Sequence, residues 1–338
     1  MRLLSITLFA VVSACAYSPR VLAQTGPGQG TWQKGVHVSL FAAAGALDYS
    51  LYLPDARAHR RERGPMPLLV ALHGCHQNAA IFAALTRFHE LADRYGFAIL
   101  FPEQTTLRNG DRCWNWFLPV NQGRVWGEAA LIAETASHVV EQYGLDRSRV
   151  YLAGLSAGGA MVNILASCYP DLFAAAAIHS GLEYLAASTL WDALDVLTAG
   201  GRLEPADSAS MAFGCSGQSR NMMPAIVVHG TRDGRVVPIN GDQVFLQFAV
   251  LGDLHDDGRA NRSVPSQPTR RSRARVPGGH TYFVDDIVWK GGVLVRKITV
   301  EGMGHAWSGG PPGLSHSDPM GPDATGMFWN FLSRFRRR

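Results

Sequence analysis

The 338-residue sequence has no apolar run long enough to cross a bilayer, no internal repeat and no Ser/Thr/Pro-rich linker. Its longest apolar segment, residues 3–16, is shorter than the roughly 20 residues that a spanning helix needs. The formal net charge is only +4, so nothing indicates nucleic acid or an anionic membrane as a partner. No C-x-x-C pair occurs either, which argues against redox catalysis. We therefore expect a monomeric globular protein with no transmembrane segment.

The amino terminus has the pattern of an export signal. A short apolar core is followed by small residues before a cleavage point after Ala23, which predicts a signal peptide over residues 1–23. The mature chain would then be secreted or periplasmic. Lipid attachment at Cys15 is the alternative, because the residues before it resemble a lipobox. Residues 24–338 are expected to form one catalytic domain without a separate substrate-binding domain.

Apolar runs that alternate with helical patterns predict the fold class. Runs typical of buried strands occupy residues 68–72, 97–101, 149–153, 173–178 and 225–229. Such alternation favours an α/β fold with one mostly parallel sheet and helices on both faces. Strands are also expected around residues 36–41, 47–53, 281–289 and 293–300.

Other segments give more local expectations. Residues 80–95 predict one helix, residues 241–251 another, and residues 323–336 a closing helix. Residues 254–276 are polar and rich in arginine and proline, so we expect an irregular excursion there.

The chemistry is expected to centre on Ser156. Residues 154–158 read G-L-S-A-G and lie between a predicted buried strand and a predicted helix. This is the pattern of the nucleophile elbow in α/β-hydrolases, where a sharp turn exposes the serine hydroxyl at the carboxyl edge of the sheet. The helix that follows adds N–H donors and a positive dipole end where an oxyanion would form.

A serine nucleophile needs a base, and the base needs an orienting acid. In α/β-hydrolases the acid and then the histidine follow the serine along the chain. His305, in a glycine-rich loop after the last predicted strand, is the best base; His280 and His316 are weaker candidates. Asp233, just beyond a buried strand, is the best acid. Asp242 is the alternative, but it falls at a predicted helix start and could simply cap that helix.

Two backbone N–H groups would stabilise the oxyanion. One is expected from Ala157, directly after the nucleophile, and the other from the loop after an earlier strand. In that loop Cys75 is the first choice and His76 the second. The two histidines of this loop could be mistaken for metal ligands. The sequence has no second cluster of ligand residues with the spacing of a metal site, so we expect no metal and no cofactor.

Four cysteines would remain after removal of the signal peptide, enough for two disulfides. Cys75 and Cys113 both follow predicted sheet strands and should lie at the same edge. We therefore expect a Cys75–Cys113 disulfide, which leaves Cys168 to pair with Cys215.

Four segments together resemble the polyhydroxybutyrate depolymerase family of secreted esterases. They are H-G-C-x-Q at residues 73–77, R-C-W-N-W-F at 112–117, G-L-S-A-G-G at 154–159 and G-H-A-W-S-G-G at 304–310. The resemblance covers residues 49–335 and implies an α/β-hydrolase fold with a Ser156–Asp233–His305 triad. It also implies an oxyanion hole formed by Cys75 and Ala157.

The resemblance implies a serine carboxylic ester hydrolase that forms an acyl-enzyme. The expected substrate is a polyhydroxybutyrate-type polyester or its oligomers, and the alternative is a feruloyl or acetylxylan ester of plant cell walls. A non-catalytic binding protein on the same scaffold is the alternative from another class. Trp114, Trp116 and Trp307 are candidate substrate-binding residues, with core packing as their other interpretation.

Overall fold

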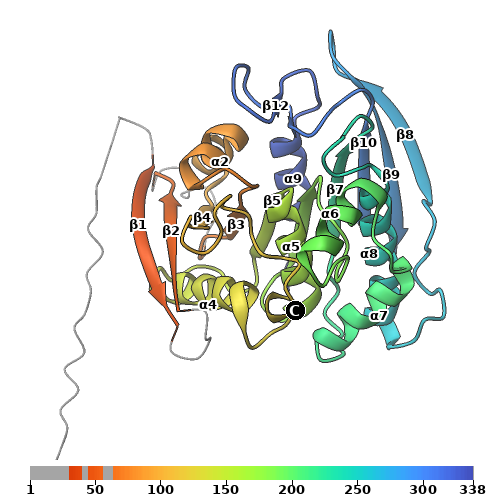
Figure 1. Cartoon of the computed structure of the whole chain (residues 1–338), viewed down its shortest axis with the longest axis horizontal. Coiled ribbons are helices and arrows are strands. Elements are labelled where there is room, and N and C mark those ends of the chain that lie inside the picture. The colour runs from red at the N-terminus through yellow and green to blue at the C-terminus, as the bar shows by residue number, and fades with distance from the viewer. Residues whose placement is uncertain (1–29, 40–44, 56–63, 338) are drawn as a thin grey trace, which may run out of the picture.

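A single ten-stranded sheet runs through the computed structural model, which describes residues 30–39, 45–55 and 64–337 (Figure 1). The predicted signal peptide and Cys15 lie outside the described residues. The strands are β1 (Thr31–Val38), β2 (Ala46–Leu53), β3 (Leu68–Leu72), β4 (Ala98–Glu103), β5 (Val150–Leu155), β6 (Ala175–His179), β7 (Ala225–Gly230), β8 (Arg270–Arg275), β9 (Thr281–Trp289) and β10 (Gly292–Val300). A separate two-stranded ribbon pairs β11 (Trp307–Ser308) with β12 (Ser317–Asp318).

The sheet is parallel in its centre and antiparallel at both ends. Its order is β1-β2-β4-β3-β5-β6-β7-β10-β9-β8. The strands from β4 to β10 in this order run parallel, while β1, β2, β8 and β9 are antiparallel to their neighbours. The segments that follow β3, β5, β7 and β10 therefore leave the sheet at the same edge.

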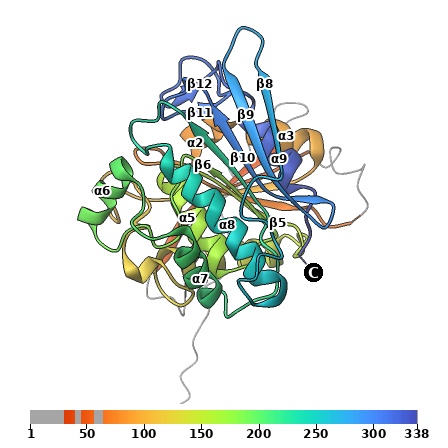
Figure 2. The ribbon, with the colours of Figure 1, turned by 90° about the vertical axis from the view of Figure 1, so that its right-hand side faces the viewer.

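Helices cover both faces of the sheet, which confirms the predicted α/β fold (Figure 2). One face carries α4 (Gly127–Gln142), α5 (Ala157–Cys168), α6 (Leu190–Ala199), α7 (Pro205–Cys215) and α8 (Ile239–Asp257). The other carries α2 (Ala79–Thr86), α3 (Phe88–Tyr95) and α9 (Ala324–Leu332). A short 3-10 helix, η1, spans Pro119–Asn121.

The strands separate two cores because successive side chains point to opposite faces. On β3, Val70 packs into the core beneath α4 and α5, whereas Leu69 packs into the core beneath α2 and α9. Both residues are fully buried, as the continuous apolar run predicted.

The helix predicted over residues 80–95 is two helices. Arg87 has a left-handed backbone, with φ of 51°, and separates α2 from α3. Its guanidinium donates a 3.2 Å hydrogen bond to the carbonyl of Gly309, in the loop that follows β11. A long-range contact thus accompanies a break that helical periodicity does not indicate.

The expectation of an irregular excursion over residues 254–276 holds only for residues 258–269, between α8 and β8. The helix α8 continues to Asp257, and β8 adds an edge strand to the sheet. Every residue of β8 is exposed, so the strand has no apolar alternation by which it could be recognised. Among the described residues, no helix combines the length and the apolar character that a bilayer-spanning segment requires.

Candidate active site

Ser156 lies at the sharp turn between β5 and α5. Its φ of 58° and ψ of −122° are strained for a residue with a side chain. The flanking glycines allow the turn, because a Cβ on Gly154 would overlap the carbonyl of Gly158, and a Cβ on Gly158 would overlap the carbonyl of Leu72. The local sequence therefore produces the strand–turn–helix geometry of a nucleophile elbow.

Asp233 and His305 face each other from two neighbouring loops. Asp233 follows β7, His305 follows β10, and the Nδ1 of His305 lies 2.8 Å from Oδ2 of Asp233. The other carboxylate oxygen of Asp233 accepts hydrogen bonds from the backbone N–H groups of Arg235 and Val236. The loops are held together where the N–H of Arg232 donates to the carbonyl of Met303 at 2.9 Å.

The carboxylate of Asp233 is kept in its charged form. Burial alone would raise the pKa of Asp233. The hydrogen bond and the charge of His305, together with the hydrogen bond from the backbone N–H of Val236, outweigh burial and lower this pKa to about 2. An ionised carboxylate can hold the N–H of the imidazole toward itself and leave Nε2 of His305 free to accept a proton.

The alternative acid and bases have other partners. Asp242 lies in the first turn of α8, where its carboxylate pairs with Lys297. His280 is bonded through Nε2 to Asp318 at 3.0 Å, and Nδ1 of His316 contacts the hydroxyl of Ser315 at 2.9 Å.

His179 connects the nucleophile to the loop of the base. Its carbonyl accepts a 2.9 Å hydrogen bond from the N–H of Ser156, and its Nε2 accepts one of 3.1 Å from the N–H of Ser308. Its ring stacks on Trp307, with 5.0 Å between ring centroids. No sequence pattern pointed to His179, because a histidine at the end of a buried strand carries no signal of these contacts.

The hydroxyl of Ser156 forms no hydrogen bond with any other residue among ranges 30–39, 45–55 and 64–337. Catalytic hydrogen bonds often tighten only when substrate is bound. The strand order places Ser156, Asp233 and His305 at one edge of the sheet, after β5, β7 and β10.

The loop after β3 lies against the nucleophile. A Cβ added to Gly74 would lie 3.5 Å from the Cβ of Ser156. The N–H of Cys75 has no hydrogen-bond acceptor in the described part of the chain, whereas the N–H of His76 donates to the carbonyl of Asp111 at 2.7 Å. Between these two candidates, Cys75 therefore has the available donor.

Ala157 supplies a second available N–H. It is the first residue of α5, and the first N–H groups of a helix have no acceptor within the helix. Ala157 directly follows Ser156 in the chain. Cys75 follows Gly74, whose backbone lies against Ser156. The arrangement can stabilise negative charge on an oxygen next to the serine.

The histidines of the loop after β3 have structural contacts instead of a ligand set. In His73, Nδ1 lies 2.7 Å from the carbonyl of Gly74, and Nε2 accepts a hydrogen bond from the N–H of Gln104 at 3.1 Å. His76 is exposed and lies near Asp111. Within the described ranges, no cluster of His, Cys, Asp or Glu has the geometry of a metal site.

Both expected disulfides are present in the structure. Cys75 is bonded to Cys113, and Cys168 is bonded to Cys215. The first joins the candidate oxyanion loop to residues 113–117. There, Glu128 is buried and accepts hydrogen bonds from the backbone and side-chain N–H groups of Asn115.

The structure contradicts the assignment of the three tryptophans to a substrate subsite. Trp114 and Trp307 are fully buried, and Trp116 is 5% exposed. The indole N–H of Trp114 donates to the carbonyl of His73, and that of Trp307 donates to the hydroxyl of Thr325. Almost no surface of these side chains is available to a substrate. They instead stabilise the loops of the site through packing and hydrogen bonds.

Comparison with known proteins links this site to esterases. Residues 47–270, more than half of the chain, match the family model described as Esterase PHB depolymerase. The chain is 31% identical over 240 residues to poly(3-hydroxyalkanoate) depolymerase C of Paucimonas lemoignei, covering 71% of this chain and 54% of that protein. It is 32% identical over 141 residues to feruloyl esterase B of Talaromyces funiculosus, covering 41% and 38% respectively.

A solved structure extends the likeness to the fold of nearly the whole chain. The acetyl xylan esterase from Aspergillus awamori aligns with a TM-score of 0.68 over 90% of this chain and 99% of that chain, at 19% identity. At that identity the match establishes a common fold. The chain spans about half the length of the depolymerase and less of the feruloyl esterase.

Proposed function

The chain belongs to the PHB depolymerase family of esterases, and on that premise we propose that it hydrolyses carboxylic esters through an acyl-enzyme on Ser156. The observation that supports this most directly is the 2.8 Å hydrogen bond between His305 and Asp233, at the sheet edge to which the elbow delivers Ser156. A serine hydroxyl becomes an effective nucleophile only beside such an oriented base.

In the proposed first half-reaction, the Oγ of Ser156 attacks the ester carbonyl carbon and its proton passes to Nε2 of His305. The carbonyl oxygen becomes an oxyanion, which the N–H groups of Cys75 and Ala157 stabilise. Asp233 balances the imidazolium charge through Nδ1. Collapse of the intermediate expels the alcohol, which takes the proton from Nε2 and leaves an acyl-Ser156 ester.

In the second half-reaction, water attacks the acyl-enzyme and gives its proton to His305. The same two N–H groups stabilise the second oxyanion. The proton then returns to Oγ of Ser156 as the acid is released. No step needs a metal or a cofactor, because the proton and the electron pairs stay among substrate, water, serine and histidine.

For the substrate, we propose a polyhydroxybutyrate-type polyester or its oligomers. The identity to the Paucimonas lemoignei depolymerase, which extends over 71% of this chain, supports this choice. A feruloyl or acetylxylan ester is the second candidate, supported by the shorter match to feruloyl esterase B. The two disulfides support an oxidising, exported location for the protein.

Hydrolysis of p-nitrophenyl butyrate by wild type and by Ser156→Ala tests the reaction. We expect turnover to fall on the order of a million-fold in the variant, while Ser210→Ala, at an exposed position on α7, should match wild type. Near-normal turnover by Ser156→Ala would overturn the assignment of the nucleophile.

A substrate panel separates the two candidate ester classes. It compares kcat/KM for hydroxybutyrate oligomers, amorphous polymer film, methyl ferulate and acetylated xylan. The proposal predicts the highest value for the hydroxybutyrate oligomers. A higher value for methyl ferulate or acetylated xylan would favour the second candidate and leave the proposed mechanism unchanged.

A further inference from the structure

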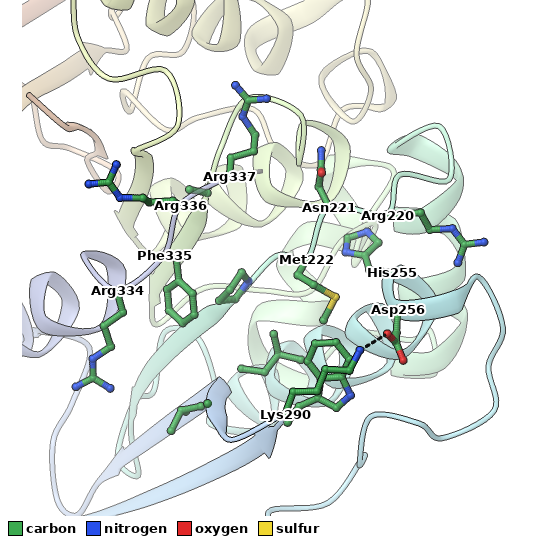
Figure 3. Close-up of a pocket in the computed structure, with 16 residues that line it drawn as sticks. Arg220, Asn221, Met222, His255, Asp256, Lys290, Arg334, Phe335, Arg336 and Arg337 are labelled. Carbon is green, nitrogen blue, oxygen red and sulfur yellow. Dashed lines mark hydrogen bonds and ion pairs between the residues drawn. The ribbon is translucent and has the colours of Figure 1, made fainter. Parts of the chain in front are cut away.

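A cavity of about 530 Å³ lies at the sheet edge opposite the candidate active site (Figure 3). It is bordered by residues at the amino ends of the parallel strands β6, β7 and β10, whereas Ser156 follows the carboxyl end of β5. The carboxyl end of α8 and the segment after α9 complete its wall. Its volume is that of a small-molecule site, and the proposed ester hydrolysis does not use it.

The cavity combines an apolar interior with cationic surroundings. Met222, Trp289, Leu294 and Phe335 provide apolar and aromatic surface. The charged lining consists of five cations and one carboxylate: Arg220, Lys290, Arg334, Arg336 and Arg337, with Asp256. In Figure 3, Arg334, Arg336 and Arg337 lie to one side of the cavity and Arg220 to the other, with Met222 and Phe335 between them.

Internal partners account for only part of this charge. Lys290 pairs with Asp256 at 3.1 Å, and Arg336 approaches Asp146 at 3.6 Å. Arg220 donates a long hydrogen bond of 3.4 Å to the carbonyl of Leu254, which does not neutralise it. Positive charge therefore remains in excess around the apolar surface, and a ligand of complementary charge would be an anion.

His255 is a buried polar group in the wall of this cavity. It is 1% exposed, and neither ring nitrogen has a hydrogen-bond partner among the described residues. Burial, assisted by the charge of Arg220, lowers the pKa of His255 to about 4. The neutral imidazole can donate one hydrogen bond and accept another, and an unsatisfied buried polar group is costly.

We propose that this cavity binds a small amphipathic carboxylate. The carboxylate would lie near His255 and Arg220, and the apolar body would lie over Met222 and Phe335. A flat anionic surface could reach the exposed arginines but not the buried ring of His255. This inference does not depend on the proposed ester hydrolysis.

Octanoate is the probe, and 1-octanol is its uncharged counterpart of the same length. Titration calorimetry should give one octanoate site per chain, with a Kd that rises with salt because charge contributes to binding. Octanol should bind at least tenfold more weakly. The intrinsic fluorescence should change on binding, and Trp289→Phe should abolish that change.

Variants assign the binding to the cavity. His255→Phe keeps an aromatic ring but removes both nitrogens, and Arg220→Gln removes one cation; each should raise the octanoate Kd about tenfold. Arg273→Gln, which removes an exposed cation on β8 outside the cavity, should leave the Kd unchanged. If His255→Phe does not fold, as judged by circular dichroism, Arg220→Gln decides the test alone.

Three results would overturn the proposal. They are equal affinities for octanoate and octanol, an octanoate Kd that Arg220→Gln and His255→Phe leave unchanged, and binding of phosphatidylglycerol vesicles without binding of octanoate. The second result would indicate that octanoate occupies another site, such as the candidate active site. The third would assign the cationic residues to a membrane surface. A failure of ester hydrolysis alone would not bear on any of these measurements.

Discussion

Nε2 of His179 accepts a hydrogen bond from the backbone N–H of Ser308, three residues beyond the candidate base His305. Because this nitrogen accepts, the ring proton belongs on Nδ1, which lies 3.1 Å from the hydroxyl of Ser180. Burial, with the nearby His229 and His305, lowers the pKa of His179 to about 3, so the acceptor persists throughout the neutral range. The neutral imidazole of His179 thereby helps to fix the loop of the base. The backbone carbonyl of His179 accepts a hydrogen bond from the N–H of Ser156.

His179→Phe should lower kcat by about 10- to 100-fold with a small effect on KM. The ring that stacks on Trp307 remains, but the buried N–H of Ser308 loses its acceptor, which costs about 1–3 kcal/mol. His179→Gln places an amide oxygen near the same N–H and should recover part of the kcat. Steady-state kinetics with p-nitrophenyl butyrate distinguish the variants. Equal kcat values for wild type and His179→Phe would assign His179 to stability alone.

Asp233→Asn should make the stability of the protein less sensitive to acid. The pKa of Asp233 falls from 3.8 to about 2 on folding, so the ionised carboxylate stabilises the fold above about pH 4 and loses this contribution as pH falls toward 2. That shift corresponds to about 2 kcal/mol at neutral pH. Urea unfolding of both proteins from pH 2 to pH 7 should give curves that converge at the acid end. Parallel curves over the whole range would contradict the inferred ionisation.

Glu183→Gln should stabilise the protein most at alkaline pH. Glu183 is buried, neither carboxylate oxygen has a partner in the described ranges, and burial followed by the charge of Glu204 raises the pKa of Glu183 from 4.5 to about 8. The unfolded chain therefore loses this proton at lower pH than the folded chain does, and the fold loses stability as pH rises from about 4.5 to 8. At pH 8 the penalty is on the order of 4 kcal/mol.

Glu204→Gln is the matched control, because it removes a neighbouring exposed carboxylate. It should change stability far less than Glu183→Gln does at pH 8, and neither substitution should matter much at pH 4. Chemical denaturation at both pH values measures the differences. A stabilisation by Glu183→Gln that is equal at pH 4 and pH 8 would show that ionisation is not its cause.

The two disulfides should differ in their effect on turnover. They have similar sequence separations, 38 and 47, so the chain-entropy model gives each about 4 kcal/mol of stabilisation. Only the Cys75–Cys113 bond holds a candidate oxyanion donor, and one such donor is worth about 2.7–4 kcal/mol in the transition state. The Cys75→Ser/Cys113→Ser double variant should therefore lose kcat under folding conditions.

The Cys168→Ser/Cys215→Ser double variant should lose comparable stability and retain its kcat. Thermal unfolding and steady-state kinetics on both double variants provide the comparison. If both variants lose kcat equally, the Cys75–Cys113 bond has no special role in the site.

Much of the parallel sheet could be predicted from sequence because its central strands are continuous apolar runs. The run at residues 68–72 corresponds to β3, and that at 225–229 lies within β7. The order of Ser156, Asp233 and His305 along the chain also indicated which loops would meet, because all three follow parallel strands. Local pattern and chain order were sufficient wherever burial alone fixed the structure.

The remaining features depend on contacts between distant segments. The edge strand β8 is held by ion pairs of Arg270 with Asp286 and of Arg271 with Asp285. No local sequence pattern predicts these ion pairs. The burial of Trp307 likewise depends on Phe82 and Phe328, which come from helices far apart in the sequence. The sequence around Trp307 therefore could not show whether this side chain belongs to the site or to the core.

The charged edge strand β8 also affects how copies of the protein meet. A strand at the end of a sheet presents unpaired N–H and C=O groups that can template pairing with another chain. Four of the six residues of β8 are arginines, and all six are exposed. Two such edges brought together would oppose rows of like charge at short range. Arg273 and Arg275 have no carboxylate partner among the described residues, so their charges protect this end of the sheet against cross-strand aggregation, and screening salt would weaken that protection.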